Sequence, residues 1–506
     1  MLREEILVVV GIFILAYSVE YLFASFDDAR EPRRVTPSVP VPIIGHFLGF
    51  LRHGFGYYNH LSRNTTAEIY TVGILNFKVY ITNSPRITQL AQKAKTLTFT
   101  PLLKTHNKIH ARLSNQADAL FHDELLEKYA HSTKQTLAPG PALNEQNMRM
   151  GNTALAELGA LLKKGGDVGL LEWAQHAVVQ ATAAGLYGVE HPLKDPEVEK
   201  AMWTWDEHRP GHMIGIDIWG TGYKARSKVW AAFKQYFAKG MPADVSLLVS
   251  ERQKILVDGG FTADEIARIQ ATLSDAAYPN TVPTLFWTVY EIFSRPELLE
   301  DIRVELWEKA VKSEDGRFVL DVAALKTACY TLLSAYQETQ RVRHYQVGFR
   351  AITEDTTLDG YLLKKGGYLQ IPAQPTHHNA GIWGGDVDEF DPYRFVSNNN
   401  KKNKNESKKI HPSAFQPWGM APHMCPGRQF ASTEILIITA LLVCRADLRP
   451  VRGKWEKNPA LRRMEIPSLP RPKKDVRVVV TEREDGVDEW VLDMGDSLTR
   501  VSLASG

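Results

Sequence analysis

The hydrophobic positions follow several different patterns along the chain. Residues 6–26 are apolar almost without interruption, apart from Ser18 and Glu20. This run matches the roughly 20 residues that a bilayer-crossing helix needs. Residues 68–72 and 77–82 are rich in β-branched and aromatic side chains around a short turn region, which predicts a β-hairpin. Much of the remaining chain has helical spacing, so we expect a mainly α-helical protein with a small β region.

The apolar N-terminal run predicts a membrane anchor. No cleavage site of small residues follows it, which distinguishes it from a removed signal peptide. Arg30, Arg33 and Arg34 follow the run, whereas only Arg3 precedes it. The positive-inside rule then places the rest of a single-pass chain in the cytosol. Because of Glu20, a helix that lies in the membrane interface stays an alternative.

A proline-rich stretch comes after the predicted anchor. Pro37, Pro40 and Pro42 restrict the backbone and favour a stiff, extended segment. No linker rich in glycine or serine divides the chain after this point. We therefore predict three parts, with an anchor at residues 1–30, a hinge at 31–45 and one large domain at 46–506.

One predicted helix is unusually long, from residue 262 to residue 295. Thr262 and Glu265 form a capping box at its start, and a proline follows directly after its end. Pro279 and Pro283 each remove a backbone hydrogen bond inside it, which predicts a bend. Such a bend suits a helix that leaves room for a bound molecule.

Shorter elements are predicted from the same patterns. We expect helices at 85–92, 122–137 and 435–443, mostly helical structure through 144–250, strands at 466–469 and 476–480, and a disordered polar loop at 398–409.

Composition narrows the possible class of protein. The chain has 506 residues, of which 44% are hydrophobic, enough for a full core. Its formal net charge of +2 and the lack of a basic–aromatic stripe give no reason to expect nucleic-acid binding. Three cysteines are too few for a disulfide framework, which favours a reducing compartment.

Cys425 is the cysteine with the most informative surroundings. It lies in the stretch WGMAPHMCPGRQFA, residues 418–431, directly before an apolar helix. Pro426 suits the first position of that helix, whose N-terminus would stabilise a thiolate, the form that ligates metal. Gly427 has no Cβ, so a flat ligand could approach the backbone there. The alternative is a buried structural cysteine.

This stretch resembles the haem-binding loop of the cytochrome P-450 family. Trp418 matches the family's aromatic residue, His423 its basic residue, Cys425 the axial ligand of the haem iron, and Gly427 the glycine after it. Ala421 stands where a glycine is usual. The resemblance implies a mainly α cytochrome P-450 fold with an N-terminal transmembrane helix.

The resemblance extends to the long predicted helix. In the family a central helix carries an acid and a threonine on the oxygen side of the haem; here Thr281 matches the threonine and Asn280 replaces the acid. Thr281 can donate and accept a proton, whereas Asn280 can hydrogen-bond but cannot titrate. The Asn-Thr-x-Pro pattern resembles the branch of sterol 7α-hydroxylases and prostacyclin synthase, which includes oxygenases and oxygen-free isomerases.

Two further elements follow in the family's order. Glu338 and Arg341 are three residues apart, so they share one face of a helix and can pair. Arg394, within 391–395, resembles the arginine of the family's Pro-Glu-Arg-Phe element, and the resemblance implies that the three form a buried structural triad. Alone, such a pair is more often surface decoration.

The resemblance also implies partners for the haem propionates. Arg350 matches an arginine that pairs with a propionate, and Lys134 and His423 take the places of two further basic partners. The alternatives are an exposed strand arginine, a solvated lysine and a histidine satisfied within the fold. A zinc site at His423 and Cys425 is not expected, because no other ligands lie at zinc-like spacing.

Taken together, the resemblance implies a membrane-bound haem-thiolate monooxygenase. It would use haem b (iron protoporphyrin IX) and electrons from NADPH through a separate cytochrome P-450 reductase, since the chain has no dinucleotide-binding fingerprint. It would insert one oxygen atom from O2 into a lipophilic substrate, such as a terpenoid, steroid, alkaloid or polyketide of fungal secondary metabolism. The catalytic domain would face the cytosol from the endoplasmic reticulum.

Two other functions remain open at this stage. An isomerase or dehydratase of the same fold would act on a peroxide without a reductase, and Asn280 motivates this alternative. A haem-binding membrane protein without turnover is the second alternative, against which the retained Thr281 argues.

Overall fold

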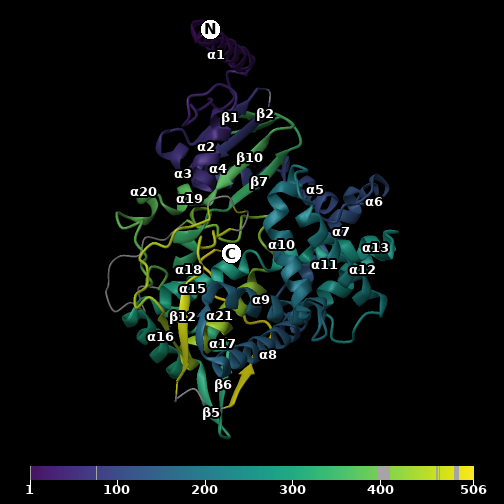
Figure 1. The fold of residues 1–506 in the computed structure, drawn as a ribbon, viewed down its shortest axis with the longest axis vertical. Coiled ribbons are helices and arrows are strands. Elements are labelled where there is room, and N and C mark those ends of the chain that lie inside the picture. Colours follow the sequence, from purple (N-terminus) through teal and green to yellow (C-terminus); the bar gives the residue numbers. More distant parts are fainter. Residues whose placement is uncertain are drawn as a thin grey trace.

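The computed structural model describes residues 2–75, 77–396, 411–462, 465, 468–483 and 489–505. Helices dominate these residues, and the strands form small sheets (Figure 1). The helices are α1 (Leu2–Ser25), α2 (Gly45–His53), α3 (Tyr57–Arg63), α4 (Pro85–Lys93), α5 (Thr100–His110), α6 (Asn115–Leu120), α7 (Asp123–Thr136), α8 (Pro141–Lys164), α9 (Leu170–Tyr187), α10 (Pro196–Met213), α11 (Thr221–Ala238), α12 (Leu247–Asp258), α13 (Ala263–Ala271), α14 (Leu273–Ala277), α15 (Thr281–Phe293), α16 (Pro296–Lys309), α17 (Val322–Thr327), α18 (Tyr330–Arg343), α19 (Ala373–His377), α20 (Ala380–Trp383) and α21 (Arg428–Arg445).

The strands are β1 (Ile69–Ile74), β2 (Phe77–Thr82), β3 (Leu97–Thr98), β4 (Gly166–Gly169), β5 (Val311–Glu314), β6 (Arg317–Asp321), β7 (Val347–Ile352), β8 (Thr356–Leu358), β9 (Tyr361–Leu363), β10 (Tyr368–Pro372), β11 (Ala446–Pro450), β12 (Arg477–Glu482) and β13 (Glu489–Asp493). The largest sheet has the order β1-β2-β10-β7-β3. Its antiparallel β1–β2 pair, with Ile69 opposite Thr82, confirms the predicted hairpin. In Figure 1 this sheet lies between α1 and the helical body.

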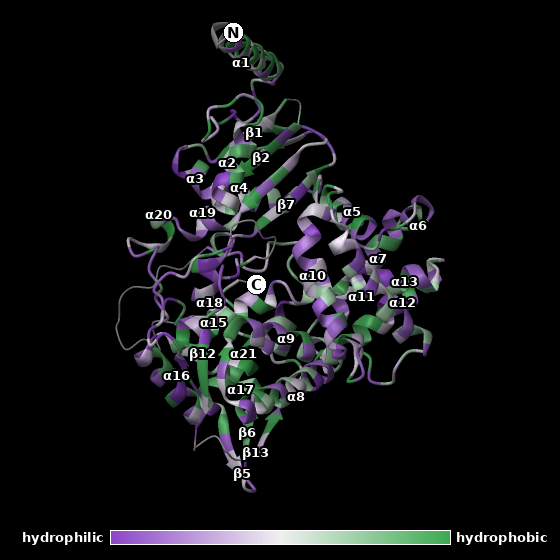
Figure 2. Ribbon diagram, viewed as in Figure 1, coloured by the Kyte–Doolittle hydropathy of each residue, from purple (hydrophilic) through white to green (hydrophobic). Residues whose placement is uncertain are grey.

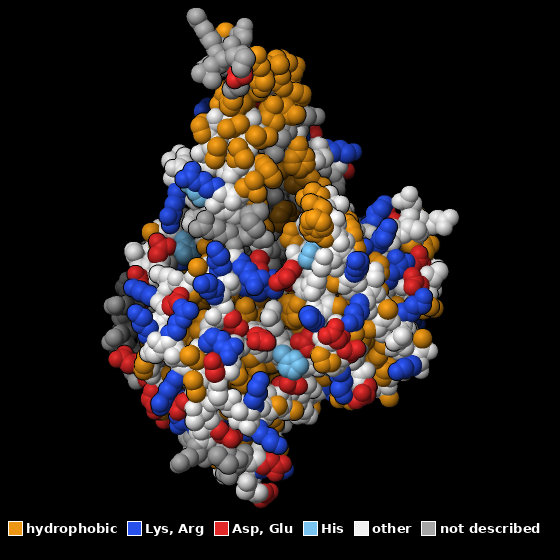
Figure 3. Space-filling model, viewed as in Figure 1, with side chains coloured by type: hydrophobic (Ala, Val, Ile, Leu, Met, Phe, Trp, Pro, Cys, Tyr) orange, Lys and Arg blue, Asp and Glu red, His pale blue; other side chains and the backbone are white. Residues whose placement is uncertain are grey.

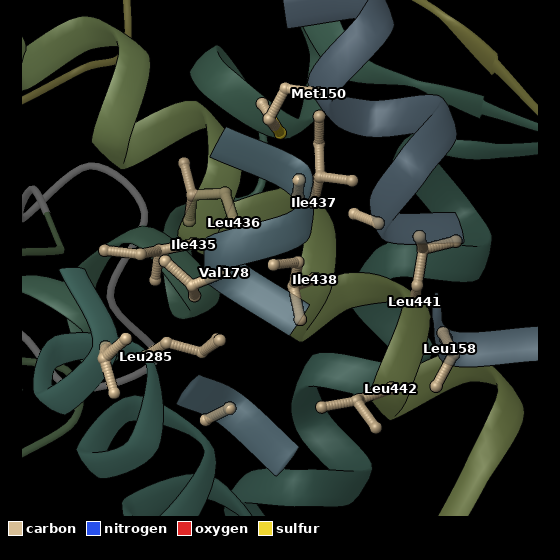
Figure 4. Close-up of a cluster of buried hydrophobic side chains, with 14 of the residues drawn as sticks. Met150, Leu158, Val178, Leu285, Ile435, Leu436, Ile437, Ile438, Leu441 and Leu442 are labelled. Carbon is tan, nitrogen blue, oxygen red and sulfur yellow. The ribbon is translucent and has the colours of Figure 1, made fainter. Parts of the chain in front are cut away.

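The centre of the helical body is built around α21. Figure 4 shows side chains of this helix, among them Ile435 and Leu441, meeting Met150 of α8, Val178 of α9 and Leu285 of α15. All five of these residues are at most 1% exposed. Full burial of an aliphatic side chain contributes about 1.5–3 kcal/mol. The predicted buried helix at 435–443 is therefore confirmed, and it holds the loop before α21 against the core.

The long helix predicted for residues 262–295 is divided into α13, α14 and α15. The capping box at Thr262 is present, so the predicted start is confirmed. The break between α14 and α15 falls at Pro279, which has no N–H to bond the carbonyl of Asp275. That carbonyl accepts a hydrogen bond from Arg209 Nη1 at 3.0 Å instead. Pro283 sits in the first turn of α15, where a proline is tolerated.

Other predicted elements have mixed outcomes. The helices predicted at 85–92 and 122–137 are confirmed as α4 and α7, and the strand at 476–480 as β12. The strand predicted at 466–469 is wrong for its described part, because Ser468 and Leu469 form a bend. The polar segment 398–409 lies outside the described residues.

Helix α1 leads away from the rest of the molecule, and many of its residues are hydrophobic (Figures 1 and 2). Leu7, Ile12 and Leu15 are each at least 60% exposed. Within the part of the chain that the structure describes, no helix combines the length and apolarity that crossing a membrane requires. A helix thus forms where the anchor was predicted, while its role as a transmembrane span stays a prediction.

The segment after α1 is tied both to the helix and to the sheet. Glu20 Oε2 accepts a hydrogen bond from the Ile43 N–H at 3.1 Å, which uses the one charge inside the apolar run. Buried Glu31 accepts from Lys78 Nζ at 2.7 Å and from the Tyr80 hydroxyl at 2.8 Å. The proline-rich hinge region is therefore fastened at both ends.

Candidate functional site

The loop before α21 is held by its own backbone hydrogen bonds. The Cys425 N–H donates to the Trp418 carbonyl at 2.8 Å, and the His423 N–H donates to the Met420 carbonyl at 3.0 Å. Gly419 has a φ of 75°, a conformation that side chains with a Cβ rarely adopt. These turns place Cys425 just before the buried helix α21.

Cys425 is half-buried as a residue, and its sulfur faces the backbone N–H groups of Gly427 and Arg428. Burial raises the pKa of the Cys425 thiol, while the N–H groups of Gly427 and Arg428 and the charge of Arg428 lower it. The net direction is upward, because desolvation of the thiolate outweighs the N–H groups and charge around it; the helix start by itself therefore does not give the stabilised thiolate expected from the sequence. The helix begins at Arg428, and Pro426 lies in the preceding turn rather than at the predicted first helical position.

Open space and an unused donor lie beside this sulfur. A Cβ added to Gly427 would find, among the described atoms, only Cys425 Sγ within 4 Å, at 3.9 Å. The indole Nε1 of Trp418 is buried and has no hydrogen-bond partner in the described structure. The surroundings of Cys425 are thus compatible with a flat ligand that lies against the loop.

Arg350, on β7, places a guanidinium in the interior. Its residue is 5% exposed, and it donates to the carbonyls of Phe349 at 2.7 Å and Met420 at 3.3 Å. No carboxylate of the described residues forms an ion pair with it. Burial lowers the pKa of Arg350 to about 10. Since buried charges are normally paired, a ligand carboxylate would complete this site.

Two further basic groups lie close to Arg350. Lys134 Nζ donates to the Pro422 carbonyl at 3.4 Å, which brings α7 to the loop of Cys425. Burial, followed by the charges of Arg350 and Lys134, lowers the pKa of His423 to about 4. The structure therefore gathers all three predicted propionate partners at one place, and their chemistry fits the two carboxylates of a haem.

Glu338, Arg341 and Arg394 meet in the interior. Arg341 donates to both carboxylate oxygens of Glu338, at 2.8 and 2.7 Å, and Arg394 Nε donates to one of them at 3.1 Å. Arg341 also donates to the carbonyls of His377 and Val387 at 2.8 Å. Glu338 and Arg341 are fully buried. This network joins α18 to the segments that follow it, at His377, Val387 and Arg394.

Asn280 and Thr281 lie at the break before α15. Thr281 Oγ1 donates to the Ala277 carbonyl at 2.8 Å. Asn280 Oδ1 accepts from the Ser468 N–H at 2.8 Å and its hydroxyl at 3.0 Å. Helix α15 packs against α21, so this break and the loop of Cys425 belong to the same core. Asn280 is thus engaged with a distant segment, a contact that the sequence did not indicate.

Another polar cluster was not identified from the sequence. It consists of His106 and His110 on α5 and Asp275 on α14. The four-residue spacing of the histidines is a signal for a shared helix face. Nothing in the sequence links Asp275 to them, because only tertiary packing brings α14 beside α5.

Comparison with known proteins identifies the family. A family model, Cytochrome P-450, matches residues 232–475. Cytochrome P-450 monooxygenase nodJ of Hypoxylon pulicicidum is 30% identical, over 96% of this chain and 96% of its own length. A cytochrome P-450 monooxygenase of Gibberella zeae is 26% identical, over 87% of this chain and 86% of its own.

A solved structure supports the same fold. The crystal structure of the cytochrome P-450DA heme domain superposes with a TM-score of 0.67 and covers 91% of this chain and 99% of its own. The sequences are 16% identical, so this likeness concerns the fold alone. With a 30% identical relative along nearly its whole length, this chain belongs to the cytochrome P-450 family and is a cytochrome P-450 monooxygenase, a family that implies a haem cofactor.

Proposed function

We propose that Cys425 is the axial ligand of haem b and that the enzyme inserts one oxygen atom from O2 into a lipophilic secondary metabolite. Terpenoids, steroids, alkaloids and polyketides are the candidate classes, and fungal relatives support this choice. One observation carries the proposal. The Cys425 sulfur faces two backbone N–H groups, and Arg350, which has no carboxylate partner among the described residues, donates to the Met420 carbonyl of the same loop.

Different residues around the site would hold different parts of the cofactor. When bound, haem supplies the oxygen chemistry. The N–H groups of Gly427 and Arg428 would stabilise the thiolate of Cys425 by hydrogen bonding to sulfur, as outer-shell donors do at metal ligands. Arg350, with Lys134 and His423 beside it, would bind the propionates. Trp418 would lie along the loop.

Thr281 is the proposed catalytic residue for moving protons. Its hydroxyl donates to the Ala277 carbonyl and still has lone pairs that accept. The Thr281 hydroxyl can therefore accept a proton from one neighbour and donate its own to another, and the helix break holds the Thr281 side chain in place. Asn280, whose Oδ1 accepts two hydrogen bonds from Ser468, would support the same break rather than titrate.

The triad of Glu338, Arg341 and Arg394 has a proposed structural role. Its charges are buried and mutually paired, and removing one partner of such a network typically costs about 3–5 kcal/mol. The triad would hold α18 and the loop after α20 below the haem site.

We further propose an anchor, hinge and catalytic domain at residues 1–30, 31–45 and 46–506, on the cytosolic side of the endoplasmic reticulum. Figure 3 shows hydrophobic side chains gathered over α1 and the adjoining end of the body. A second apolar segment, residues 213–219, carries Ile218 and Trp219 at 81% and 84% exposure. Exposed apolar groups of this size favour a membrane surface.

The ligand assignment is tested with Cys425→Ala. We expect this variant to lose the thiolate-type absorption of the ferrous carbon monoxide complex, because the loop contains no other thiol; its remaining sulfurs are the thioethers of Met420 and Met424. Cys444→Ala is the matched control and should keep the absorption, since Cys444 is fully buried in the core. An unchanged spectrum in Cys425→Ala would show that the ligand is a different residue.

The reaction class is tested by electron supply. The proposed NADPH–cytochrome P-450 reductase should be required for turnover of the substrate, which metabolite profiling of a strain lacking the protein would identify. Product formed without NADPH, and none formed with reductase, would instead favour the isomerase alternative.

A further inference from the structure

His106, His110 and Asp275 bring three possible metal ligands to one point. The histidines lie on the same face of α5, with ring centroids 4.4 Å apart. His106 Nε2 is 3.9 Å and His110 Nδ1 is 3.8 Å from Asp275 Oδ2. Helix α5 also contacts α10, and Figure 1 shows the two close together.

The atoms that converge are not otherwise used. His110 Nδ1 and Asp275 Oδ2 are buried and have no hydrogen-bond partner among the described residues. The side chains of His110 and Asp275 are 3% and 6% exposed. Buried polar atoms without a partner destabilise the folded protein. A bound cation would satisfy them together.

The second oxygen of Asp275 is oriented by Arg209. Arg209 Nη1 is 3.4 Å from Asp275 Oδ1, and Arg209 also pairs with Asp206. Asp206 in turn is 3.2 Å from Arg471. The Arg209 charge is thus shared between two carboxylates, and Asp275 Oδ2 stays directed at the histidines. A second polar partner of this kind is usual for carboxylates that ligate metal.

We propose that His106, His110 and Asp275 form a binding site for one zinc ion. Two imidazole nitrogens and a carboxylate oxygen are a known zinc ligand set, with the fourth position left to water. Zinc bonds of about 2.0–2.2 Å place neighbouring ligand atoms roughly 3.3–3.6 Å apart. The two histidine–Asp275 separations, 3.9 and 3.8 Å, need to shorten by a few tenths of an ångström, and all three ligand atoms lie within 4.8 Å of one another. His106, whose side chain is 37% exposed, has room to turn.

Asp275 lies six residues before Thr281 along the same broken helix. A second histidine pair, on α10, lacks a comparable carboxylate oxygen without a hydrogen-bond partner in the described structure. His208 and His212 are also four residues apart, but His212 is 3.3 Å from Asp217, whose Oδ2 already accepts the Tyr223 N–H at 2.8 Å.

The experiment uses the full-length, haem-loaded protein in detergent, freed of loosely bound metal by a chelator; one portion is titrated with Zn2+ and another is dialysed against Zn2+ before elemental analysis. Isothermal titration and elemental analysis should give one zinc per chain. His110→Ala and Asp275→Asn should each weaken zinc binding at least tenfold, whereas His208→Ala, the matched control, should bind as the wild type does. Circular dichroism checks that each variant is folded.

Zinc K-edge X-ray absorption counts the imidazole ligands of the bound zinc. A residue that only supports the fold would not change this count. We expect scattering from two imidazoles in the wild type and from one in His110→Ala. The proposal is overturned if folded His110→Ala and Asp275→Asn bind zinc like the wild type, if His208→Ala alone loses it, or if the wild type binds none.

Discussion

At the scale of single residues, Arg350 has the most unusual environment in the proposed haem site. Its guanidinium is buried, donates only to carbonyl groups in the described structure, and lies close enough to His423 to lower the pKa of that imidazole. A buried cation without a carboxylate destabilises the protein until an anion arrives. This side chain is therefore better suited to binding a ligand than to folding.

We predict that Arg350→Leu lowers the haem content of the purified protein severalfold, because one charge-assisted pair to a propionate is lost. The haem-free protein should lose little stability, since a buried charge is removed with the arginine. Haem content is measured as the pyridine complex and stability by thermal unfolding. Arg317→Leu, an exposed strand arginine, is the control. Equal haem content in Arg350→Leu and the control would contradict the role.

At the scale of elements, the helix breaks and the free helix matter most. The prolines were correctly expected to disturb the long helix. At the break between α14 and α15, Arg209 donates to the Asp275 carbonyl and Ser468 donates to the Asn280 side chain. Helix α1 is the opposite case: its residues form a helix, and its apolar side chains have little protein to pack against. The apolar side chains of α1 therefore need a partner outside the described structure, and a membrane is the proposed one.

Removal of residues 2–25 should shift the protein from the membrane pellet to the supernatant, because the exposed apolar surface of α1 is lost. The ferrous carbon monoxide spectrum should stay unchanged, since α1 contributes no residue to the proposed haem site. Sedimentation of cell membranes measures the first outcome. A truncated protein that still sediments would assign membrane binding to another surface, such as residues 213–219.

At the scale of the whole molecule, the core contains a carboxyl group that links stability to pH. Glu434 of α21 is fully buried, and Thr182 Oγ1 of α9 hydrogen-bonds its carboxyl oxygens at 2.7 and 2.8 Å. Burial raises the pKa of Glu434 to about 8, whereas an unfolded glutamate titrates near 4.5. The folded state therefore holds a proton that the unfolded state releases between these two pH values.

It follows that this group destabilises the fold increasingly as pH rises from about 4.5 to about 8, by at most roughly 1.4 kcal/mol per pH unit. Glu434→Gln keeps a neutral partner for Thr182 and removes the titration. We expect its thermal midpoint to fall less than that of the wild type between pH 5.5 and pH 7.5. Glu124→Gln, on the exposed side of α7, should behave as the wild type. Parallel curves for all three proteins would refute the buried titration.

Local sequence determined the hairpin, most helices, the buried helix after Cys425 and the residues of its loop, because hydrophobic period, capping and proline act over a few neighbouring positions. The resemblance to the cytochrome P-450 family, and not any local pattern, singled out Thr281, Glu338 and Arg394, which occur in the order that the family has. Neither source could predict the net direction of the Cys425 pKa, because it depends on how deeply the packed core desolvates the sulfur.

Only the tertiary structure decided which distant groups meet. It joined Asn280 to Ser468, Arg350 to the loop of Cys425, and His106 and His110 to Asp275. These contacts span from 70 to 188 residues of sequence. Contacts at such separations leave no local pattern, since they arise when whole helices pack and not from the preferences of the residues themselves.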